Sequence, residues 1–170
     1  MFDYMIGVDV ALRKTGIVFV KMDPLEIVES KVIQYKAEMT TGTYEESEDY
    51  YKFIKAAFLD LVPDDLRSAR FVVEGMPRHG HYKSAIKIMI ARVNFYRLIS
   101  ELFPDAPVRV PDVFVWKKDL MGKANMTKDG TKEFLEYHYS YIPGLTNALK
   151  YVDTMDAAAL ALWGLTYGEY

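Results

Sequence analysis

Residues 6–10, with the sequence Ile-Gly-Val-Asp-Val, place one carboxylate inside an apolar run near the start of the chain. The apolar residues that flank it on both sides, several of them β-branched, predict a buried strand over 4–10. Removing an ionised carboxylate from water costs several kcal/mol, so a buried Asp normally has a metal ion, a cation or backbone donors beside it. Asp9 therefore requires the rest of the chain to supply such partners.

The composition is that of an ordinary globular protein, and it excludes several kinds of site. The 170 residues are 51% hydrophobic and 26% charged, which predicts a single domain over 1–170. Because the chain has no cysteine, a disulfide framework, a thiolate metal site and a thiol nucleophile are excluded. We find no signal peptide and no apolar run of the ~20 residues that a membrane span needs, and we expect an intracellular, cytoplasmic protein without membrane contact.

Charge is distributed unevenly along the chain. The net charge is −3, but residues 78–118 contain eight basic and three acidic residues and so carry +5. A basic central segment on an acidic chain permits phosphate binding on one face. A solvated helix face, balanced by acids elsewhere, explains this single observation equally well.

Hydrophobic periodicity predicts an α/β domain with a mixed sheet flanked by helices. Strands over 4–10, 16–21 and 26–35 would form an antiparallel meander. The later predicted elements are a helix over 45–61, a strand over 69–74, a helix over 82–103, a strand region over 108–116 interrupted by Pro111, a loop over 117–129, and helices over 131–141 and 153–167.

The predicted helix over 82–103 is apolar around most of its circumference. Such a helix must be covered on two sides, by its own sheet and by something else. Since the chain has few helices left for the second side, we expect another subunit to cover it.

Three further acids lie in positions that could bring them to Asp9. Glu74 ends the predicted strand over 69–74, and Asp153 and Asp156 are three residues apart on one face of the last helix. Four acids from three separate elements suit two Mg²⁺ ions, which prefer oxygen ligands and clamp the attacking and leaving oxygens of a phosphoryl displacement. Taken singly, Asp153 and Asp156 could instead cap a helix, and Glu74 could be a strand-end acid that faces water.

Three segments together resemble the acidic motifs of the RuvC-type Holliday junction resolvases, within the RNase H-like superfamily. They are Asp9-Val10-Ala11-Leu12-Arg13-Lys14-Thr15-Gly16, Phe71-Val72-Val73-Glu74, and Asp153-Thr154-Met155-Asp156-Ala157-Ala158-Ala159-Leu160-Ala161. The segments occur in the family's order and at similar separations, and the resemblance spans essentially the whole chain.

The resemblance implies an RNase H-like fold and a homodimer formed through the helix over 82–103. A small resolvase without cysteine would suit a bacterium or a phage equally well. It also implies Mg²⁺- or Mn²⁺-dependent, paired symmetric nicking of four-way DNA junctions. Asp9, Glu74, Asp153 and Asp156 would bind two metal ions. Lys117 resembles one of the family's active-site lysines. The family's second active-site lysine has two candidates in this chain. Lys128 matches by its distance from Gly122, and Lys132 matches by its place at a predicted helix start.

Nucleic-acid contacts are expected around this site. Arg13 follows the first acid, and Arg78 and Tyr82 follow the second, where the family tends to place an aromatic wedge. This chain departs from that pattern, with Met-Pro-Arg-His-Gly-His-Tyr at 76–82. Arg78 could contact phosphate, and Tyr82 or His81 could stack on a base. Lys118 and Lys132 are further predicted contacts. Two other functions remain open at this point: a relative that acts on RNA or on other branched nucleic acid, and a catalytically silent binding module.

Overall fold

A five-stranded mixed sheet, with the strand order β3-β2-β1-β4-β5, forms the centre of the computed structural model, which describes residues 2–39, 42–76 and 82–167. The strands are β1 (Tyr4–Asp9), β2 (Lys14–Met22), β3 (Leu25–Gln34), β4 (Ala69–Val73) and β5 (Val108–Arg109). β1, β2 and β3 pair antiparallel, and β4 pairs parallel to β1 and to β5. The predicted meander and mixed sheet are confirmed.

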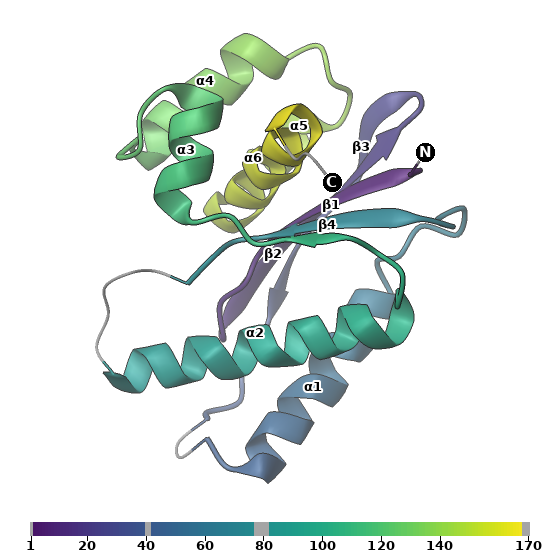
Figure 1. Cartoon of the computed structure of the whole chain (residues 1–170), viewed down its shortest axis with the longest axis vertical. Helices are drawn as coiled ribbons and strands as arrows, with labels where there is room; N and C mark the ends of the chain where they lie inside the picture. Colours follow the sequence, from purple (N-terminus) through teal and green to yellow (C-terminus); the bar gives the residue numbers. More distant parts are fainter. Residues whose placement is uncertain (1, 40–41, 77–81, 168–170) are drawn as a thin grey trace.

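Helices cover both faces of the sheet (Figure 1). α1 (Tyr44–Leu59) and α2 (Tyr82–Leu102) lie below it in that view, and α3 (Val113–Met121), α4 (Lys128–Tyr139), α5 (Leu145–Ala148) and α6 (Val152–Tyr167) lie above it. α1 begins where the local sequence specifies: the Thr43 hydroxyl accepts from the Glu46 amide, and the Glu46 carboxylate accepts from the Thr43 amide.

Successive residues of the sheet alternate between two hydrophobic cores. On β1, Met5 packs in the upper core with α6, whereas Tyr4 and Ile6 pack in the lower core with α1 and α2. Asp9 is four residues after Met5, so its side chain points to the same face of the sheet and is expected to face α6. The side-chain alternation thus fixes which helix layer the carboxylate meets.

The prediction of a strand region over 108–116 and a loop over 117–129 is wrong. β5 ends at Arg109, and residues 113–121 form α3. Its N-cap is Asp112, which accepts from the Phe114 amide (2.8 Å), and its C-cap is Gly122 at φ 75°. The apolar run Val-Phe-Val-Trp favours a strand by composition, but these caps and the burial of Trp116 stabilise a helix.

The next helix begins earlier than expected, at Lys128 instead of Thr131. Thr127 is its N-cap and accepts from the Gly130 amide (3.1 Å), while Thr131 is fully buried. The short helix α5 was not predicted. The ends of the other elements differ from the prediction by no more than two residues.

α2 buries one side and leaves the other exposed. Phe95 and Leu98 are fully buried in the lower core, whereas Met89 is 51% exposed and Val93 57% exposed.

Among the described residues, no helix is long and apolar enough to cross a membrane.

Candidate active site

Asp9 and Glu74 lie side by side at the ends of two adjacent parallel strands. Val8 pairs with Val73, and the Glu74 amide donates to the Val8 carbonyl (3.0 Å), so that Asp9 and Glu74 occupy the next position in the same register. Neighbouring strands lie about 4.8 Å apart. The structure thus brings together two acids that are 65 residues apart in the chain.

Two glycines bring α6 onto this position. A Cβ atom on Gly7 would lie 1.9 Å from the Ala157 carbonyl oxygen, and one on Gly16 would lie 2.0 Å from the Asp153 carbonyl oxygen. Gly16 is also the β2 partner of Asp9. The helix backbone therefore lies directly on the strand backbone, and the first turn of α6, with Asp153, is held beside Asp9.

Asp9, Glu74, Asp153 and Asp156, which we call the acid cluster, interact electrostatically. Burial raises the pKa of Asp9 well above its usual value, and the charges of Glu74 and Asp156 raise it further. Burial and the charge of Asp156 likewise raise the pKa of Glu74. The protein holds these acids close together in spite of their repulsion, so the site favours a cation.

Lys128, in the first turn of α4, supplies one cation. Its ammonium donates to Asp156 Oδ2, and Asp156 is only 3% exposed. Burial lowers the pKa of Lys128, but the hydrogen bond and charge of Asp156 outweigh burial, so the pKa is raised. The Lys132 ammonium lies 3.8 Å from exposed Glu136 on the same helix. Of these two candidate lysines, the structure places Lys128 at the acid cluster.

Lys117 lies on α3 and not in the predicted loop. Its ammonium donates to the Met126 carbonyl (3.3 Å), just before the cap of α4. Its assignment as an active-site lysine stays a prediction.

Two buried residues at the site were not predicted from the sequence. The Trp116 indole is fully buried and donates to Glu74 Oε1 (3.2 Å). Arg92, on α2, is 4% exposed and lines a cavity of about 190 Å³ with Asp9 and Glu74. The Arg92 Nε and Nη1 atoms have no hydrogen-bond partner among the described residues. Arg92 places a second positive charge at the acid cluster, from the opposite side of the sheet, and unlike Lys128 it is buried.

The donor set fits divalent metal ions, although no metal cage is preformed. Within the described ranges, no three Asp, Glu or His side chains are already arranged to hold an ion. Asp156 Oδ1 is buried and has no hydrogen-bond partner among those residues. Carboxylate oxygens are the ligands that Mg²⁺ prefers, and a bound ion would relieve the repulsion within the acid cluster.

The predicted nucleic-acid contacts lie in different places. Arg13 is exposed in the turn between β1 and β2, and Lys118 is exposed on the last turn of α3. Arg78 and the loop 77–81 lie outside the described residues, and Tyr82 is described only as the first residue of α2. All of these contacts stay predictions.

No protein-family model and no curated protein matches the chain. Solved structures do match. A Thermus thermophilus RuvC structure has a TM-score of 0.71 at 18% identity, with 97% of this chain and 95% of that chain covered. T. thermophilus RuvC in complex with a Holliday junction substrate also gives 0.71, at 16% identity, with coverage of 97% and 94%. The yeast mitochondrial Holliday junction resolvase Ydc2 gives 0.62 at 10% identity, with coverage of 94% and 77%. The chain has the RNase H-like fold of these resolvases.

Proposed function

We propose that residues 1–170 form a single nuclease domain that resolves four-way DNA junctions by paired symmetric nicking, with two divalent metal ions at the acid cluster. The observation that carries this proposal is the register of Asp9 and Glu74 at the ends of parallel strands, with α6 seated on the same face. Its support from outside the chain is the shared fold, because one of the similar structures holds a Holliday junction.

The four acids would hold two Mg²⁺ ions, with Mn²⁺ as a substitute. When bound, these ions supply an activated water for attack at phosphorus and stabilise the leaving 3′ oxygen. The four carboxylates would hold the ions, and the positive charge of the ions would offset the repulsion between the ionised carboxylates. Buried Trp116 fixes the orientation of the Glu74 carboxylate through its indole hydrogen bond.

Two positive side chains, Lys128 and Arg92, balance the negative charge of the acid cluster from opposite sides of the sheet. Lys128 is paired with Asp156 in this structure, and its half-exposed side chain could turn its ammonium to a phosphate oxygen and offset negative charge there. Arg92 is too deeply buried to bind a duplex. We assign it to positioning Glu74 and Asp9.

The nuclease would act as a homodimer through α2. The supporting observation is that Met89 and Val93 are more than half exposed on a helix whose other side is core. A twofold pair would present two acid clusters to a substrate that has twofold symmetry itself. Sedimentation at micromolar concentration is expected to give twice the chain mass of 19.6 kDa, and a strictly monomeric protein would contradict the dimer.

The function is tested by offering the protein a synthetic four-way junction, a matched duplex, a flap and an RNA–DNA hybrid, each with Mg²⁺ or with EDTA. We expect symmetric nicks in two opposing strands of the junction, only with Mg²⁺. Equal cleavage of hybrid or flap would favour the relative with another substrate. Binding without cleavage under any metal condition would favour the silent module.

A further inference from the structure

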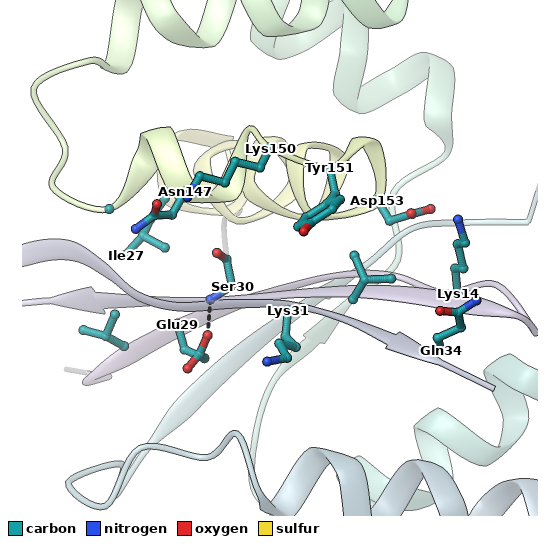
Figure 2. A pocket seen from close by; sticks show the side chains of 13 residues that line it. Lys14, Ile27, Glu29, Ser30, Lys31, Gln34, Asn147, Lys150, Tyr151 and Asp153 are labelled. Atoms are coloured by element: carbon teal, nitrogen blue, oxygen red, sulfur yellow. Dashed lines mark hydrogen bonds between the residues drawn. The ribbon is translucent and has the colours of Figure 1, made fainter. Parts of the chain in front are cut away.

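The structure contains a second polar groove, of whose lining residues the proposed mechanism uses only Asp153. It has a volume of about 580 Å³ and lies between the edge strand β3 and the segment that joins α5 to α6. Figure 2 shows Lys31 on the strand side, and Lys150 and Tyr151 on the opposite wall. Lys14 and Asp153 lie together at one end of the groove, and Asn147 lies towards the other.

The groove is positively charged, because three lysines from three segments converge on it. Lys14, Lys31 and Lys150 make no ion pair within 4.0 Å with any described residue, whereas Lys21, Lys55 and Lys128 are each paired with an acid. Glu29, the other acid of the groove besides Asp153, accepts from the Ser30 amide (2.9 Å). Unpaired ammonium groups around one hollow form a site for anions.

The position of Asp153 connects this groove to the acid cluster. Its backbone carbonyl lies against Gly16 beside Asp9, while the same residue lines the end of the groove. A polyanion that places one phosphate at the acid cluster can therefore extend along β3. Tyr151, 63% exposed, and Asn147 add neutral groups that hydrogen-bond phosphate and sugar.

We propose that this groove binds the phosphate backbone of the DNA strand that continues from the cleaved phosphate, with Lys31 and Lys150 as its central contacts. The inference rests on the proposed function and adds the path of the substrate to it. A different explanation exists for Lys31 alone, since charged residues on an edge strand prevent pairing with another sheet. That explanation does not account for Lys150 and Lys14, which are on other segments.

The test measures the affinity of a fluorescent four-way junction in EDTA, over a series of KCl concentrations, for the wild type and for Lys31→Ala/Lys150→Ala. Each lost phosphate contact lowers the salt slope, the steepness of log K against log[salt], by about 0.9. We expect the double variant to lower the slope by about 1.8 and to weaken binding on the order of 10- to 60-fold near 0.1 M salt. Its melting temperature should be unchanged, because both lysines are exposed.

The control is Lys52→Ala/Lys55→Ala, which removes the same charge from α1, below the sheet (Figure 1). It should bind within about twofold of the wild type, because net charge alone contributes little beyond a Debye length. If the two double variants had equal junction affinities and equal salt slopes, the proposal that this groove binds DNA would be overturned. The proposal would also be overturned if Lys31→Ala/Lys150→Ala self-associated, as seen by light scattering, while its affinity for the junction stayed unchanged. A wild type that binds no junction would instead overturn the proposed function itself.

Discussion

Asp9→Asn is expected to abolish junction cleavage while the protein still binds the junction. Loss of a residue that only supports a metal ligand typically costs about 10–100-fold, so loss of a ligand itself should cost on the order of 1,000-fold or more. Junction affinity should stay within about threefold of the wild type, because the basic contacts lie elsewhere. Strand cleavage in Mg²⁺ and binding in EDTA are the two measurements.

A second measurement on this variant separates metal binding from folding. The half-buried Asp9 carboxylate is repelled by Glu74 and Asp156. Its raised pKa means that ionisation of Asp9 destabilises the folded protein as the pH rises above the pKa of the unfolded state. At neutral pH in EDTA, Asp9→Asn should therefore unfold at a temperature about 2–4 °C higher, for each kcal/mol of repulsion removed. Mg²⁺ should raise the melting temperature of the wild type but not of the variant.

Asp64→Asn is a suitable control, since Asp64 is exposed in the loop before β4. It should leave cleavage and the Mg²⁺ effect unchanged. Full activity in Asp9→Asn would contradict the assignment of the acid cluster.

Gly7→Ala is expected to destabilise the fold by about 4 kcal/mol or more, which is at the diagnostic end of single substitutions. The new methyl group would lie 1.9 Å from the Ala157 carbonyl oxygen and 2.8 Å from the Ala161 amide nitrogen, so the backbone of α6 must move. Thermal unfolding should show a decrease of about 10 °C or more.

Gly130→Ala makes a matched comparison in helix α4. There the nearest atom to the added methyl group is the Met126 sulfur at 2.7 Å, at the movable end of a flexible side chain. Because alanine favours a helix more than glycine does, this variant should stay within about 1 kcal/mol of the wild type. Equal stability of the two variants would contradict the close packing of α6 on β1.

The strands and the four acids could be predicted because their signals are local. The continuous apolar run of β1 identifies a buried strand and makes the charge of Asp9 conspicuous, and the helical spacing of Asp153 and Asp156 puts both on one face of α6. What a local pattern does not contain is the pairing of β1 with β4, which sets Asp9 beside Glu74.

The remaining site residues depend on tertiary packing. The sequence predicts a strand at Trp116 because its neighbours are β-branched or aromatic, whereas the caps at Asp112 and Gly122 are the signal that favours the observed helix. The choice between the two lysines depended on where α4 begins, which Thr127 determines. One sequence signal for Arg92 was available. It lies between Ile88 and Tyr96 at four-residue spacing, so it places a charge in an otherwise apolar row of the helix.

The acid cluster lies where the two layers of the molecule meet. The sheet contributes two of its acids, the upper helices contribute Asp153, Asp156, Lys128 and Trp116, and Arg92 comes from below. An intermediate with only one helix layer docked therefore has no complete site. For the nuclease proposed above this dependence would be a safeguard, because a nascent, damaged or partly unfolded chain would not nick DNA.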